Sequence, residues 1–130
     1  MEQASAWDDV ALQYANGFQQ VDLWADRLLE LYDSLPDNEA VRCLQIEILA
    51  SRPDSLIVRK YGRELGRHVQ ESAAEVLQSG RFGSPEYERQ WQQLDSYLRE
   101  QGHRKNPGTT ADLIAASIFL ASYRRDVCDG

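Results

Sequence analysis

The chain has 130 residues and a mass of 14.8 kDa, the size of one ordinary domain. Apolar residues make up 42% and charged residues 27%, a composition typical of globular rather than disordered chains. The net charge of −7 argues against broad binding to nucleic acids or anionic membranes, while it leaves room for a local cationic pocket.

The chain shows no sign of a membrane segment or a secretory leader. Its longest apolar run, from Leu113 to Ala121, is much shorter than the ~20 residues that a membrane span needs. The first residues are acidic and lack the apolar core of a signal peptide. Cys43 and Cys128 have no metal-like spacing and are expected to be free thiols in a reducing compartment. We therefore expect a cytoplasmic protein whose partners include neither nucleic acid nor membrane.

The first half of the chain is predicted to be helical. Apolar residues recur at helical spacing, and no strand or hairpin pattern is present. Helices are expected at about residues 7–16, 18–34 and 39–50. Asn38 is a candidate N-cap for the third of these, and Pro53 ends it because a proline disfavours helix in the residue before it.

A long fourth helix is predicted from about Ser55 to Gln78. Its expected buried stripe consists of Val58, Tyr61, Leu65, Val69, Ala73, Val76 and Leu77. Gly62 and Gly66 lie four residues apart on one face of it. Two explanations stay open for this pair: the glycines let a neighbouring helix cross closely, or they make room for a ligand.

Two more helices complete the prediction. Ser84 followed by Pro85 is a strong start signal for a helix to about Gln101, which should bury Tyr87, Trp91, Leu94 and Leu98. The last helix should begin at Thr109 or Thr110 and end near Arg125, and it is apolar nearly all round. The predicted fold is therefore all-α, a bundle of five to six helices with a buried C-terminal helix, forming a single domain over residues 1–130.

The segment from Asp54 to Gly62 is the first candidate site. Asp54 or Ser55 can cap the helix that follows, and Arg59 and Lys60 lie in its first two turns. Cations near a helix N-terminus oppose the helix dipole, and a bound anion would offset that cost. The alternative is that both cations are solvated or paired with an acid such as Glu64.

The segment from His103 to Asp112 is the second candidate site. Arg104 and Lys105 precede a Pro-Gly turn, and Gly108 allows a close backbone approach. Thr109 or Thr110 can then cap the last helix and leave its first N–H groups free for a phosphate. Asp112 is expected in the first turn, where it could complement the dipole, hold a metal or take a proton. An ordinary N-cap with a first-turn acid is the alternative.

In this order and spacing, the two segments resemble the triphosphoribosyl-dephospho-CoA synthase family, which is all-helical. Members carry an Asp-Thr-Leu-Ile-x-Arg-Lys-x-Gly segment, matched here by Asp54, Ser55, Leu56, Ile57, Arg59, Lys60 and Gly62. They later carry an Asn-Pro-Gly-Thr-Thr-Ala-Asp-Leu segment, matched from Asn106 through Leu113. The family's earlier Pro-Lys-Pro-Gly-Leu-Val-Asp and Asn-Thr-x-Lys-Gly segments are not in this sequence. The chain therefore resembles the C-terminal half of the family.

The resemblance implies a transferase that uses ATP and 3′-dephospho-CoA and releases adenine, or a variant of this reaction related to C1-carrier metabolism. The 2′-hydroxyl of dephospho-CoA attacks the ribose carbon that carries adenine, so the site needs phosphate ligands, a metal such as Mg²⁺ and a proton acceptor. Asp54 and Asp112 are the expected metal ligands or catalytic base. The expected phosphate ligands are Arg59, Lys60, Arg104, Lys105, Asn106, Gly108, Thr109 and Thr110.

The alternative function is a non-catalytic helical module, or a half that needs a partner chain or a second copy of itself. This alternative predicts a contiguous apolar patch on the surface. The enzyme hypothesis instead predicts that Arg59, Lys60, Asn106 and Asp112 converge in space.

Overall fold

A computed structural model describes residues 20–103 and 107–129, and every regular element in these two ranges is a helix. The all-α prediction is therefore confirmed for this part of the chain. The helix expected at residues 7–16 lies outside it. The described helices are residues 20–34, α2 (Asp37–Ser51), α3 (Ser55–Tyr61), α4 (Arg63–Gln78), α5 (Pro85–His103) and α6 (Gly108–Asp129).

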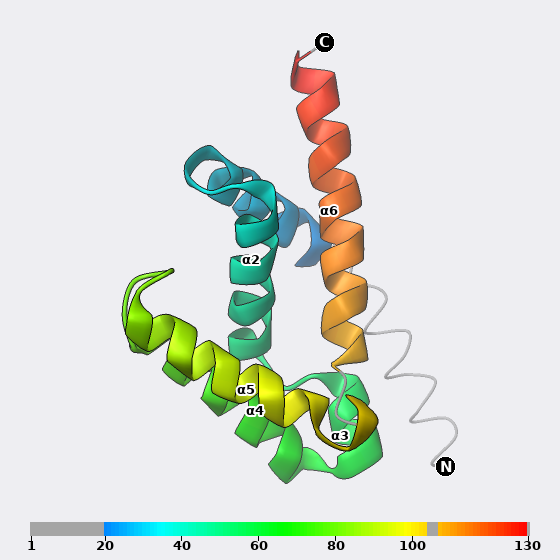
Figure 1. The fold of residues 1–130 in the computed structure, drawn as a ribbon. Coiled ribbons are helices and arrows are strands. Elements are labelled where there is room, and N and C mark those ends of the chain that lie inside the picture. Colours follow the sequence, from blue (N-terminus) through cyan, green and yellow to red (C-terminus); the bar gives the residue numbers. More distant parts are fainter. Residues whose placement is uncertain (1–19, 104–106, 130) are drawn as a thin grey trace, which may run out of the picture.

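Helix α2 is the element that the rest of the fold surrounds (Figure 1). Ile46 and Leu49 face a cluster built with α3, α4 and α5, whereas Ala40, Cys43, Leu44 and Ile48 face a second cluster built with residues 20–34 and α6. A helix buried on two sides has apolar residues around most of its circumference. Since α2 contributes to both clusters, it joins the two halves of the core.

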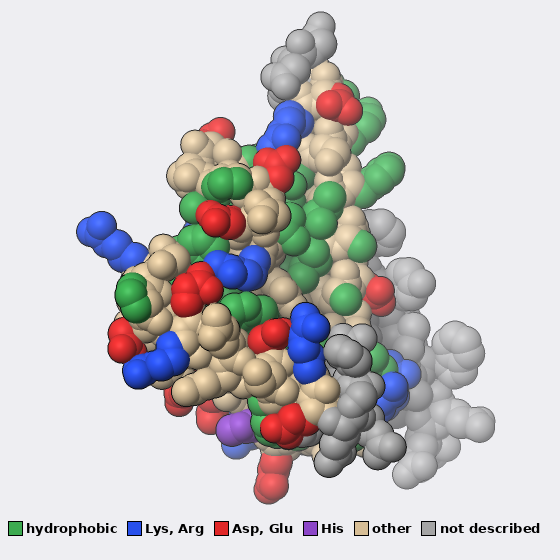
Figure 2. Space-filling view, in the orientation of Figure 1, with side chains coloured by type: hydrophobic (Ala, Val, Ile, Leu, Met, Phe, Trp, Pro, Cys, Tyr) green, Lys and Arg blue, Asp and Glu red, His purple; other side chains and the backbone are tan. Residues whose placement is uncertain are grey.

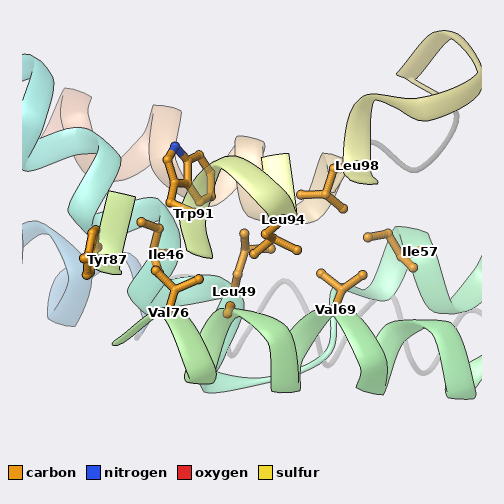
Figure 3. Close-up of a cluster of buried hydrophobic side chains, with 10 residues drawn as sticks. Ile46, Leu49, Ile57, Val69, Val76, Tyr87, Trp91, Leu94 and Leu98 are labelled. Atoms are coloured by element: carbon orange, nitrogen blue, oxygen red, sulfur yellow. The ribbon is translucent and has the colours of Figure 1, made fainter. Parts of the chain in front are cut away.

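The first cluster fixes the position of α4 and α5 against α2. Tyr87, Trp91, Leu94 and Leu98 form the buried stripe of α5, as the sequence predicts. Figure 3 shows how side chains from α2, α3, α4 and α5 converge in this cluster: Ile46, Leu49, Ile57, Val69, Val76, Tyr87, Trp91, Leu94 and Leu98. Ile57 brings the short α3 into the core, so the segment that follows Asp54 has a fixed position.

Helix α6 is buried along one side only, although its sequence predicts a helix enclosed by the core. Leu113, Ser117 and Ala121 form the buried side and lie in or beside the second cluster. Phe119, Tyr123 and Val127 are exposed. The expectation of a buried C-terminal helix is thus correct for the face turned to α2 and wrong for the opposite face. Sequence periodicity misleads here because large apolar side chains occur on both faces.

The predicted helix from Ser55 to Gln78 is divided in two at Gly62. Gly62 has φ 102° and ψ 167°. This conformation lies outside the helical region, and its positive φ favours glycine. The interruption divides the expected buried stripe between two helices. Val69, Ala73 and Val76 of that stripe are buried, whereas Tyr61 and Leu77 are exposed. The prediction of one continuous helix is therefore wrong.

The two glycines have different roles. A Cβ atom at Gly66 would lie 2.5 Å from Cγ2 of Val58 and 3.3 Å from Cβ of Pro53. Gly66 therefore lets α4 pack closely against α3 and the turn before it, which supports the packing explanation. Gly62 has open space where a Cβ would stand and serves as the break between the helices.

The helix caps were predicted with mixed success. Ser84 caps α5 as expected, because its Oγ accepts a hydrogen bond from the N–H of Tyr87 at 3.3 Å. Asn38 is not the N-cap of α2, since that helix begins at Asp37, two residues before the expected start, and has Pro36 at its cap. In the described ranges, no helix is both long and apolar enough to cross a membrane.

We predict that Gly66→Ala lowers the free energy of unfolding by about 1 kcal/mol. The added methyl group overlaps the branched side chain of Val58, a cost of about 1–3 kcal/mol that exceeds the roughly 1 kcal/mol gained in helix propensity. Urea unfolding followed by circular dichroism measures the change. Ser72→Ala, at an exposed position of the same helix, is the control and should change stability by less than about 0.5 kcal/mol. An unchanged or raised stability of Gly66→Ala would contradict the close packing of α3 on α4.

Candidate functional site

Asp54 is the buried N-cap of α3. Its Oδ1 accepts hydrogen bonds from the backbone N–H groups of Leu56 at 3.0 Å and Ile57 at 3.2 Å. The first N–H groups of a helix have no partner within the helix, so a capping carboxylate satisfies them. The sequence left Asp54 and Ser55 open as caps, and the structure assigns Asp54.

The second oxygen of the same carboxylate holds the start of α6. Asp54 Oδ2 accepts hydrogen bonds from the Thr110 N–H at 2.7 Å and from the Thr110 hydroxyl at 2.8 Å. Both residues are buried. One side chain therefore joins the N-termini of two helices that are far apart in the sequence.

Two further contacts bring the same two segments together. The hydroxyl groups of Ser55 and Thr109 share a hydrogen bond of 2.6 Å. Gly108 lies against the side chain of Leu56, and a Cβ atom at Gly108 would collide with Leu56 Cδ2. The Asp54–Gly62 segment and the start of α6 therefore meet, as a shared site requires.

The position of α6 changes the expected anion site. The helix begins at Gly108, so Thr109 and Thr110 lie in its first turn and neither is its cap. The Thr110 N–H donates to Asp54, which corrects the expectation that this amide is free for a phosphate. The amides of Gly108 and Thr109 are the two that remain at this helix start without an intrahelical partner.

Arg59 and Lys60 lie in the last turn of α3 and are exposed. Because α3 ends at Tyr61, both cations complement the C-terminal end of its dipole instead of opposing its start. The argument that an anion must offset an unfavourable dipole is therefore wrong. Among the described residues, neither cation forms an ion pair with Glu64 or with any other acid, so both charges face solvent at the C-terminal end of α3.

Asp112 is exposed and lies just beyond the first turn of α6, one position later than the sequence suggests. Its carboxylate is accessible to a ligand, unlike that of Asp54, which already accepts four hydrogen bonds. Within residues 20–103 and 107–129, no three His, Cys, Asp or Glu side chains gather into a metal-binding group. Arg104, Lys105 and Asn106 lie outside the described residues.

A cavity that sequence patterns do not indicate lies beside the turn that precedes Asp54. Its volume is about 380 Å³, and its lining consists of Gln20, Leu23, Trp24, Arg27, Glu47, Ser51 and Arg52. The Arg27 guanidinium donates to both oxygens of Glu47, at 2.9 Å from Nε to Oε1 and 3.2 Å from Nη2 to Oε2. Charged residues twenty positions apart give no sequence signal of such a pair.

Cys43 lies next to this ion pair and is held as a neutral thiol. Burial and the hydrogen bond from its Sγ to Glu47 raise the pKa of Cys43 to about 12. The thiol is therefore a poor nucleophile at neutral pH. This agrees with the expectation of a free cysteine and gives it no catalytic role.

The geometry describes a class of protein: an all-helical fold in which two polar segments meet at a helix start beside two exposed cations. A family model for ATP:dephospho-CoA triphosphoribosyl transferases matches residues 1–129, so this chain belongs to that family. The resemblance found in the motifs is thereby confirmed.

A solved structure supports the same relationship. The crystal structure of a candidate triphosphoribosyl-dephospho-CoA synthase from Archaeoglobus fulgidus is 34% identical and superposes with a TM-score of 0.67. The match covers 86% of this chain but only 44% of the Archaeoglobus chain, so this chain spans less than half of that relative. No curated protein matches.

We predict that Asp54→Asn lowers the free energy of unfolding by about 2–3 kcal/mol. An amide has one acceptor oxygen, so its NH₂ group must face either the N–H groups of α3 or the N–H and hydroxyl groups of Thr110, and buried donors lose their partner. Chemical denaturation measures the loss. Asp112→Asn is the matched control, because an exposed carboxylate without such bonds should cost less than about 0.5 kcal/mol. Equal effects of the two substitutions would contradict the role of Asp54.

Proposed function

We propose that this chain forms the phosphate-binding part of an enzyme that transfers the triphosphoribosyl group of ATP to dephospho-CoA. The observation that supports this most strongly is the Asp54 carboxylate, which joins the two family segments through the Thr110 N–H and hydroxyl. Segments 56 residues apart then present their remaining polar groups to one region. ATP and a dephospho-CoA-like acceptor are the proposed substrates.

We assign the triphosphate to Arg59, Lys60 and the start of α6. Arg59 and Lys60 supply exposed positive charge at the end of α3, and the amides of Gly108 and Thr109 are hydrogen-bond donors at the start of α6. Arg104, Lys105 and Asn106 precede that helix start in the sequence and are proposed to extend the same phosphate site. Phosphate held at these groups would orient the ribose for attack.

The transfer exchanges one bond at the ribose carbon of ATP. The 2′-hydroxyl oxygen of dephospho-CoA bonds to that carbon as the carbon–nitrogen bond to adenine breaks. The hydroxyl proton passes to a base, and adenine leaves with the bonding electron pair and takes up a proton. Asp112 is the proposed base or metal ligand, because its carboxylate is exposed at the start of α6. We assign Asp54 a positioning role in place of its expected catalytic or metal-binding one, since its four acceptor positions are occupied. Mg²⁺ bound with the triphosphate would supply charge neutralisation there.

Two remaining assignments concern the setting of the enzyme. The buried, protonated thiol of Cys43 fits the reducing environment of a cytoplasm. Since the match covers 44% of the Archaeoglobus chain, groups from the part of the family fold that this chain does not match are proposed to complete the site. A purely structural role as an interaction module is favoured by one observation, the exposed apolar side of α6.

We predict that the chain binds ATP with Mg²⁺ and that Arg59→Ala or Lys60→Ala weakens this binding ~10-fold or more, because each removes a charged donor to phosphate. Isothermal titration, with and without dephospho-CoA, measures the affinity, and chromatography detects released adenine. Arg89→Ala is the control, since Arg89 is exposed on α5 and pairs with Glu86. An absence of binding at millimolar ATP, or equal losses in all three variants, would contradict the proposed phosphate site.

A further inference from the structure

One side of α6 exposes three large apolar side chains in a single row. Phe119 is 75% exposed, Tyr123 61% and Val127 60%. They are four residues apart, so they lie along one face of the helix. Apolar side chains stand out along this helix in Figure 2. We call Phe119, Tyr123 and Val127 the α6 row.

Asp112 lies on the same face as the α6 row. Phe119 and Tyr123 follow it by seven and eleven residues, which places each within about 20° of it around the helix. The buried residues Leu113, Ser117 and Ala121 lie on the opposite side. The proposed base and the apolar row therefore belong to one continuous surface.

Contacts on its other side hold α6 in place. Arg124 donates to carboxylate oxygens of Asp22 at 2.5 Å and Asp26 at 2.6 Å, both on helix 20–34. The Arg125 guanidinium lies 4.0 Å from the centre of the Tyr32 ring. The C-terminal half of α6 is thereby positioned, yet no element in residues 20–103 and 107–129 covers its row of apolar side chains. A row of this kind on a fixed helix is typical of a docking surface.

The comparison with the solved relative indicates what covers this surface. More than half of the Archaeoglobus chain has no counterpart in the match, although the matched part is 34% identical. We propose that the α6 row is the docking surface for the remaining half of the family fold, and that docking closes the site over Asp112. The proposed docking is supported by the exposed α6 row and by the greater length of the Archaeoglobus chain. The closure over Asp112 rests on the proposed function.

The experiment uses, as its probe, the part of the Archaeoglobus relative that this chain does not match, produced as a separate polypeptide and used only once circular dichroism and a cooperative thermal transition show that it is folded. Analytical ultracentrifugation and isothermal titration without nucleotide should show a one-to-one complex with the full chain. Phe119→Asp and Tyr123→Asp should each weaken the complex ~10-fold or more, because exposed aromatic anchors dominate such interfaces. Circular dichroism should show unchanged folding, since neither side chain is buried.

Leu23→Asp is the matched control, because Leu23 is 69% exposed on helix 20–34 and lies outside the row. No complex, or a complex equally sensitive to Leu23→Asp and Phe119→Asp, would overturn the proposal. A dimer of the chain alone that Phe119→Asp dissociates would also overturn it and assign the surface to a second copy. Since ATP titration of the chain needs no probe, a failure of docking is distinguishable from a failure of the phosphate site.

Discussion

The buried carboxylate of Asp54 is the interaction on which the site depends. A charged group enters the interior of a protein only when hydrogen bonds replace its lost hydration. Here one oxygen caps α3 and the other binds the backbone and hydroxyl of Thr110. The same bonds that compensate burial also fix the two helix starts relative to each other. Asp54 therefore holds the two helix starts together, which fits the positioning role that we propose for it.

The packing around this carboxylate leaves little freedom for the two segments. Gly66 lets α4 approach Val58, and Gly108 lets the start of α6 approach Leu56, so side chains at either position would force the helices apart. Helix α2 contributes to both core clusters and so packs against α4 on one side and against α6 on the other. The result is a rigid support that presents Arg59, Lys60 and Asp112 at its surface. The buried helix starts and the three exposed side chains are consistent with a site that the remaining half of the family fold completes.

Sequence patterns were sufficient for the helices whose apolar residues follow one stripe, such as α5 with Tyr87, Trp91, Leu94 and Leu98. They failed at Gly62, where the positive φ of the backbone divides one predicted helix into α3 and α4. The apolar spacing of the sequence continues across this break and gives no sign of it. They also failed for α6, whose apolar residues on both faces do not tell which face is covered. The motifs picked out two segments that the structure brings into contact. Only the structure could show that the second carboxylate oxygen of Asp54 accepts hydrogen bonds from Thr110, since no local pattern encodes that contact.

Amide hydrogen exchange at Thr110 tests the role of Asp54 most directly. The first amides of an exposed helix start normally exchange fast, because water reaches them without unfolding. If the Asp54 carboxylate holds the Thr110 N–H in the interior, this amide will exchange about as slowly as core amides such as that of Leu113, and far more slowly than that of Thr109. Exchange of Thr110 as fast as Thr109 in the native protein would contradict the joining of α3 and α6 by this side chain.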